Sequence, residues 1–92
     1  MSIQYSILIP TYNSLRLEST LDQLHSFFGG KWRYEIIVIN DGGKPLILDD
    51  SVMLLEFEEN YGKNYALFEG IKKARGERII TLDDDGQQPV KE

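Results

Sequence analysis

The sequence of 92 residues predicts an α/β fold on a mainly parallel sheet, with the element order β-α-β-β-α-β. Two observations lead to this prediction. Short apolar runs bounded by turn residues recur along the chain, as is typical of strands buried on both faces of a sheet. Two segments between them space their apolar residues three and four apart, as in a helix that packs on a sheet. Right-handed crossovers would place these helices against the sheet faces.

The first half of the chain predicts a strand, a helix and a second strand. The first strand covers Tyr5–Pro10, where the run YSILIP ends at a proline. The helix that follows has one apolar face, formed by Leu17, Leu21, Leu24 and Phe28. Ser14 is its expected N-cap, and Gly29-Gly30 is its expected end. The second strand covers Tyr34–Asn40 and stops at an Asp-Gly-Gly turn.

The second half predicts a strand, a helix and a final strand. The run VMLLEF places a strand at Val52–Phe57, and the loop EENYGKN follows it. A helix is expected over Asn64–Ala74 and is closed by Gly76. Its apolar side is expected to carry Leu67, Phe68 and Ile71. The last strand, Arg78–Leu82, leads directly into three aspartates.

Composition bounds the kind of protein. A chain of 92 residues with 41% hydrophobic and 27% charged residues is typical of one small folded domain. The net charge of −5 argues against nucleic acid as a partner, because such proteins usually carry a basic stripe. The absence of cysteine excludes disulfides and thiolate metal sites. No apolar run approaches the ~20 residues that span a bilayer, and the N-terminus lacks the features of a signal peptide, so a cytoplasmic location is expected.

Polar residues collect where three of the predicted strands end. These clusters are Pro10-Thr11-Tyr12-Asn13, Asn40-Asp41-Gly42-Gly43 and Asp83-Asp84-Asp85. Ligands of open α/β sheets bind beyond the carboxyl ends of the strands. If the strands are parallel, all three clusters share one rim, and that rim is the expected site.

The acidic triplet has two interpretations. In an extended segment, Asp83 and Asp85 point the same way and Asp84 points opposite. Two such carboxylates can hold Mg²⁺ or Mn²⁺, and the amide oxygen of Gln87 continues the alternation. The alternative is a solvated acidic turn, which is the usual meaning of an isolated Asp-x-Asp. Its position after an apolar strand, beside two other polar clusters, favours the metal site.

Other polar residues of the rim have simpler alternatives. Asp41 precedes a glycine, and Asp-Gly is a common turn dipeptide; its functional interpretation is an acceptor for a base or a ribose. Lys63 could meet a phosphate, but alone it is better explained as an exposed lysine where a helix starts.

His25 lies beside the apolar face of the first helix and is interpreted as a surface or boundary residue, not a catalyst.

Several nucleotide- and metal-binding motifs are missing. The sequence has no GxGxxG after its first strand and no GxxxxGK[ST]. The acidic run is not an EF-hand, because its sixth position is Gln88 in place of glycine. A receiver domain would place an acidic pair after the first strand, where this chain has Pro-Thr-Tyr-Asn.

Four motifs, in order and spacing, resemble family 2 glycosyltransferases with the GT-A fold. They are SILIPTYNS, YEIIVINDGG, NYGKNYALFEGIKKARGE and RIITLDDDGQQP. The resemblance spans nearly the whole chain. It is strongest to the polyprenyl-phosphate branch, which includes dolichyl-phosphate mannose synthase and undecaprenyl-phosphate sugar transferases. The chain departs from that branch at Gly86, where leucine is common, and at Gln88, where histidine is common.

The resemblance implies a role for each residue of the rim. The donor would be a UDP- or GDP-sugar, the cofactor Mg²⁺ or Mn²⁺, and the acceptor a polyprenyl phosphate. Asp83 and Asp85 would be the catalytic acids and, with Gln87, the metal ligands. The nucleotide-sugar would contact Pro10, Thr11, Tyr12, Asp41, Lys63 and Asp84, with Asp41 at the nucleobase and Lys63 near the phosphates.

The resemblance also implies that residues 1–92 are the N-terminal, donor-binding part of a truncated domain whose acceptor half is absent. The isolated chain is then expected to be inactive. Three alternatives stay open: a non-catalytic fragment that binds nucleotide and metal, a transferase acting on a saccharide hydroxyl in polysaccharide synthesis, and a remnant that forms homo-oligomers through an exposed sheet edge.

Overall fold

The centre of the structure is a parallel sheet of four strands in the order β3-β2-β1-β4. The computed structural model describes residues 2–83. In chain order its elements are β1 (Tyr5–Thr11), α1 (Leu17–Phe28), β2 (Tyr34–Asp41), β3 (Val52–Phe57), α2 (Lys63–Lys73) and β4 (Arg78–Thr81). The predicted α/β class, element order and parallel pairing are therefore confirmed. This architecture agrees with part of a GT-A domain.

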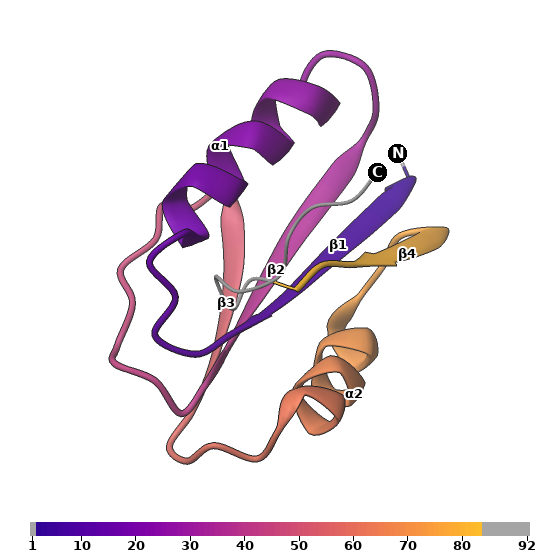
Figure 1. The fold of residues 1–92 in the computed structure, drawn as a ribbon. Coiled ribbons are helices and arrows are strands. Elements are labelled where there is room, and N and C mark those ends of the chain that lie inside the picture. The colour runs from indigo at the N-terminus through magenta and orange to yellow at the C-terminus, as the bar shows by residue number, and fades with distance from the viewer. Residues whose placement is uncertain (1, 84–92) are drawn as a thin grey trace.

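The core has two halves, one on each face of the sheet, because successive residues of a strand point to opposite faces. One half joins α1 to alternate residues of β1 and β2: Ile7, Ile9, Leu17, Leu21, Phe28, Ile36 and Val38. The other joins α2 to the residues between them: Leu8, Ile37, Ile39 and Ala66. Figure 1 shows α1 and α2 on opposite sides of the sheet. The two central strands are thus buried on both faces, as their continuous apolar runs predict.

The face that α2 turns to the sheet differs from the predicted one. Phe68 and Ile71 are 57% and 48% exposed, so the prediction was wrong for these two residues, while Leu67 does pack against the core. The helix instead buries the small residues Ala66 and Gly70. A Cβ at Gly70 would come within 2.9 Å of the Ile39 Cδ1 atom. Small residues let the helix lie close on the sheet and leave its larger apolar residues at the side.

Pro10 does not end the first strand, which continues to Thr11. A proline inside a central strand lacks one ladder donor. The carbonyl of Leu8 accepts the N–H of Leu82 from the β4 side. The missing N–H of Pro10, two residues on, faces that same side, where strand pairing has ended at Leu8↔Thr81. The ladder to β2 therefore stays complete.

The two outer strands are less buried than predicted. Three of the four residues of β4 are exposed, and β3 is half-buried over most of its length. Each has a strand neighbour on one side only among residues 2–83. The apolar character of these strands predicted their existence correctly but overestimated their burial.

The helix ends confirm some of the expected boundaries and correct others. Helix α1 stops before Gly29, as predicted, but Ser14 is not its N-cap. The Ser14 hydroxyl accepts the N–H of Arg16 and closes a turn before the helix.

Helix α2 ends at Lys73, before Gly76, whose N–H donates to the Ser6 hydroxyl. With 12 and 11 residues, neither helix of the described chain is long and apolar enough to cross a membrane.

A polar network ties the turn after α2 to the central strands. The Ser6 hydroxyl and the Arg75 N–H both donate to the Glu35 Oε2 atom, at 2.6 and 2.7 Å. The Arg75 guanidinium lies 3.2 Å from the other carboxylate oxygen. Burial alone would raise the pKa of Glu35, but these hydrogen bonds and the guanidinium charge outweigh it and hold that pKa below its usual range. Glu35 therefore stays ionised at neutral pH and joins β1 and β2 to the turn between α2 and β4.

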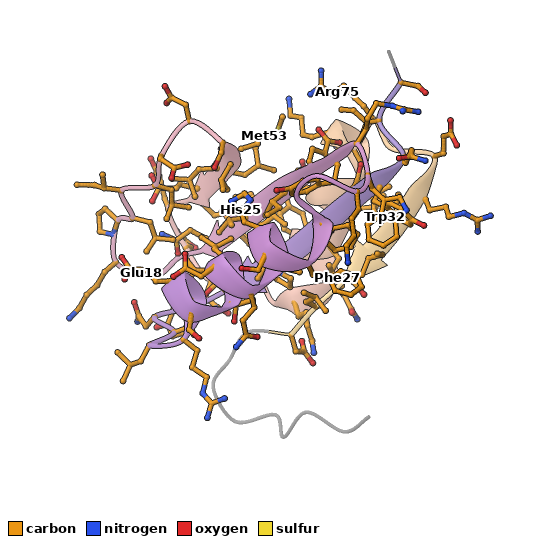
Figure 2. The ribbon with its side chains drawn as sticks, turned by 90° about the horizontal axis from the view of Figure 1, so that it is seen from above. Glu18, His25, Phe27, Trp32, Met53 and Arg75 are labelled. Carbon is orange, nitrogen blue, oxygen red and sulfur yellow. The ribbon has the colours of Figure 1, made fainter. Side chains whose placement is uncertain are left out.

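Aromatic residues close the end of the core near the C-terminus of α1. Phe27 and Trp32 stack with ring centroids 5.5 Å apart, and Figure 2 shows them together at this end, with Glu18 at the other. Trp32 also packs edge-on against Tyr5, and Tyr34 packs against Phe28. Packing therefore accounts for both Trp32 and Tyr34.

Candidate functional site

A cavity of about 210 Å³ opens at the carboxyl ends of the strands. Its lining comes from the end of β1, the end of β2, the loop before α2, the start of α2 and Asp83, which lies two residues after β4. The lining residues are Pro10, Thr11, Tyr12, Asp41, Asn60, Gly62, Lys63 and Asp83. The fold therefore gathers residues 72 positions apart in sequence, from Thr11 to Asp83, around one space.

Most of the residues predicted for the site line this cavity. Parallel pairing places the ends of β1 and β2 side by side, with Thr11 opposite Asn40. Thr11 is buried and Tyr12 is 52% exposed, so of these two lining residues Tyr12 is the one at the protein surface. Asp84, Asp85 and Gln87 lie outside the described residues, and their predicted roles stay predictions.

Asp41 fastens the loop before α2 to the end of β2. Its side chain is buried, and its two carboxylate oxygens accept the N–H groups of Tyr61 and Gly62 at 2.8 and 2.9 Å. The Asn60 amide donates in turn to the Asp41 carbonyl at 3.0 Å. Sequence reasoning missed this role, because the partners lie about twenty positions away. A carboxylate has about four acceptor sites, so Asp41 keeps capacity for a ligand as well.

Gly42 allows that loop to lie against the strand end. Its φ is +84°, and a Cβ there would come within 2.4 Å of the Asn60 nitrogen and of the Glu59 carbonyl carbon. The Asp-Gly turn that the sequence predicts is present, and the glycine is also required by the loop that crosses it.

Asn40 organises the turn on the other side of Asp41. Its amide nitrogen donates to the Glu56 carboxylate and to the Lys44 carbonyl, and its amide oxygen accepts the N–H of Gly43. These bonds join β2, β3 and the turn after β2. The buried Asn40 and Asp41 together connect the end of β2 to the turn after it, to β3 and to the loop before α2.

Lys63 and Asp83 form an ion pair at the cavity. The Lys63 Nζ atom donates to the Asp83 Oδ1 atom at 2.6 Å. The side chains are 52% and 32% exposed, so the pair lies at the protein surface. A second cavity of about 310 Å³, lined by Leu67, Thr81 and Leu82 among others, also has Lys63 and Asp83 in its wall. The pair therefore lies where the two cavities meet.

The carboxylate oxygens of Asp83 are suitable ligands for a hard cation. Carboxylate oxygens are ligands that Mg²⁺ and Mn²⁺ favour, and the Asp83 carboxylate lies at the cavity beside a positive counter-charge. Within residues 2–83, no three acidic, histidine or cysteine side chains form a group that could hold a metal ion. The described part of the chain thus contributes one suitable ligand.

His25 lies away from the cavity and acts in structure. Its ring nitrogens contact the Tyr34 hydroxyl at 2.6 Å and the Ser51 hydroxyl at 3.3 Å. Ser51 donates to Asp49, and hydrogen bonds from the Ser51 hydroxyl and N–H lower the pKa of that carboxyl. Histidine thus links α1 to β2 and to the segment before β3, in agreement with its interpretation as a boundary residue.

Comparisons with known proteins identify the family and several relatives of this chain. The sequence profile of the family described as Glycosyl transferase family 2 matches residues 6–91. An uncharacterized glycosyltransferase, YkcC, of Bacillus subtilis is 32% identical, over 95% of this chain and 30% of its own. A dolichyl-phosphate beta-glucosyltransferase of Drosophila melanogaster is 32% identical, over 92% and 32%. An undecaprenyl-phosphate 4-deoxy-4-formamido-L-arabinose transferase of Pseudomonas fluorescens is 33% identical, over 95% and 29%. The chain thus spans about a third of the length of these relatives.

Proposed function

The chain belongs to glycosyl transferase family 2, and we propose that it forms the donor-binding part of an enzyme that transfers a sugar from a nucleotide to a polyprenyl phosphate. The observation that carries this proposal is the cavity at the carboxyl ends of the strands. Its lining brings together an aromatic residue, a buried carboxylate, a lysine and the first acid of the triplet. This set suits a nucleoside diphosphate, which has a base to stack, hydroxyls to hydrogen-bond and a charged end to neutralise.

We propose that the donor nucleotide lies along the cavity with its base at the β1 end. Tyr12 would give the base an apolar surface beside Pro10 and Thr11, and Asp41 would accept hydrogen bonds from the base. Lys63, at the start of α2, would meet the diphosphate. Asp84 would lie near the ribose or the sugar. Because Asp41 already holds the loop that leads to Lys63, it would fix both ends of the nucleotide relative to each other.

Mg²⁺ or Mn²⁺ is the proposed cofactor, with Asp83, Asp85 and Gln87 as its protein ligands. A divalent cation supplies charge neutralisation for the departing nucleoside diphosphate. Asp83 and Asp85 would serve catalysis in this way. The described residues contribute Asp83, whose carboxylate is paired with the Lys63 ammonium.

A polyprenyl phosphate is the acceptor that the relatives' names favour, since they include dolichyl-phosphate and undecaprenyl-phosphate transferases. An acceptor phosphate is ionised at neutral pH and needs no strong general base. A saccharide hydroxyl would need one. The relatives' names are therefore the ground on which the phosphate acceptor is preferred to the saccharide.

Calorimetric titration tests the proposed donor site. UDP and GDP are titrated into the chain with and without Mn²⁺, and we expect binding that is stronger with the cation. Asp83→Asn should remove most of the cation dependence and leave the melting temperature nearly unchanged, because the ion pair of Asp83 with Lys63 lies at the surface, where such pairs contribute little to stability. Equal affinity with and without Mn²⁺, in both proteins, would contradict the donor-site assignment.

A further inference from the structure

The ion pair between Lys63 and Asp83 places a positive charge on an oxygen that the proposed function assigns to a divalent cation. We propose that Lys63 is an internal counter-ion, which competes with the cation for Asp83 and becomes available to a phosphate once displaced. This inference deepens the proposed function and rests on it. It makes cation binding and nucleotide binding depend on each other through one side chain.

The pair is not needed to hold the fold together. Both side chains are substantially exposed, and exposed ion pairs contribute little to stability. The backbone leading into α2 is already fixed, because Asp41 accepts the N–H groups of Tyr61 and Gly62. Helix α2 itself is held on the sheet by Ala66 and Gly70. The contribution of this pair to the stability of the fold is therefore expected to be small.

The charge of Lys63 and its distance from Asp83 allow it to compete with a divalent cation for the Asp83 carboxylate. Its Nζ atom lies 2.6 Å from the Asp83 Oδ1 atom, in direct hydrogen-bond contact with a lone pair that a cation would use. An ammonium and a divalent cation on one carboxylate would repel each other at short range. Lysine carries its charge on a flexible stem of four carbons, so Nζ can leave while the helix stays in place.

The displaced Lys63 ammonium would still face a cavity that could hold a phosphate. Lys63 and Asp83 lie in the walls of both the 210 Å³ and the 310 Å³ cavities. A phosphate in the first cavity would offer Lys63 a second anion without a change of backbone. The coupling free energy between two bound ligands is reciprocal. A cation that frees Lys63 therefore raises the affinity for the phosphate, and a bound phosphate raises the affinity for the cation by the same factor.

The test measures Mn²⁺ binding alone, by the electron paramagnetic resonance signal of the free ion, and then UDP and GDP binding by calorimetry. Lys63→Met removes the charge and keeps much of the stem. It should bind Mn²⁺ alone about fivefold more tightly, the upper value for loss of an exposed pair, and should bind nucleotide more weakly in the presence of the cation. Lys72→Met is the matched control, because Lys72 lies on the same helix and pairs with Glu69 outside the cavity. It should leave both affinities unchanged.

The outcomes separate this inference from the proposed function. If wild-type chain binds nucleotide with a cation dependence that Asp83→Asn removes, but Lys63→Met binds Mn²⁺ with wild-type affinity, the counter-ion role is wrong and the donor site stands. If Lys63→Met and Lys72→Met tighten Mn²⁺ binding equally, the effect is one of net charge and the inference also fails. If the wild-type chain binds neither Mn²⁺ nor nucleotide, the proposed function fails and the inference fails with it.

Discussion

Replacing Gly42 with alanine is expected to destabilise the folded chain by about 3 kcal/mol or more, the largest loss we expect from one methyl group here. The new Cβ would lie 2.4 Å from backbone atoms of Glu59 and Asn60. Backbone cannot move aside as a flexible side chain can, so the loop that carries Asn60, Tyr61 and Gly62 would have to lift from the end of β2. The measurement is urea unfolding followed by the fluorescence of Trp32.

Gly30 offers the matched control for that substitution. Its φ of +80° is close to the +84° of Gly42, but a Cβ at Gly30 would meet no atom within 4 Å. Gly30→Ala should therefore show the cost of the left-handed conformation alone, about 1 kcal/mol. If the two alanine variants lose the same stability, the loop does not lie on Gly42 as described.

Replacing Asp41 with alanine is expected to cost about 2–3 kcal/mol of stability, because hydrogen bonds to a charged acceptor are worth more than neutral ones. The N–H groups of Tyr61 and Gly62 would lose their acceptor at the same time. Asp41→Asn should cost less, since it keeps one of the two acceptor oxygens. Nucleotide affinity should fall in both variants, because the loop places Lys63. Urea unfolding and calorimetry measure the two effects.

Asp50 serves as the control for Asp41. It is an exposed aspartate in the turn before β3, and Asp50→Ala should change stability by less than about 0.5 kcal/mol. A stable Asp41→Ala variant with wild-type nucleotide affinity would show that Asp41 neither fastens the loop nor contacts the ligand.

Much of the fold could be predicted from the sequence because the signals are local. The runs YSILIP and YEIIVIN predicted the two central strands, which are buried on both faces. The same apolar pattern in β3 and β4 could not reveal that these are edge strands, because position within a sheet depends on pairing between distant segments. The packing of Gly70 against the sheet likewise could not be predicted from the sequence. Only the approach of α2 to Leu8 and Ile39 shows why small residues face the sheet there.

The candidate site was predictable in outline and not in its internal bonds. Polar residues at strand ends share a rim whenever the strands are parallel, so Thr11, Asp41 and Asp83 could be grouped before the structure was known. The hydrogen bonds of Asp41 to residues 61 and 62 join segments twenty positions apart and leave no periodic pattern. Asn60 and Gly62 in the motif NYGKN were the available signal, but sequence reasoning interpreted that stretch as a loop that enters a helix, with a ligand contact as the alternative, and not as the partner of Asp41.

The central claim, that a donor nucleotide binds in the cavity at the carboxyl ends of the strands, is tested most directly by amide chemical shifts of ¹⁵N-labelled chain titrated with UDP or GDP and Mg²⁺. We predict that the largest changes occur at Thr11, Tyr12, Asp41, Gly62 and Lys63. Amides at the opposite end of the sheet, such as those of Gln4, Arg33 and Glu77, should hardly shift. Changes concentrated at that opposite end or around His25, or no changes with either nucleotide, would contradict the account.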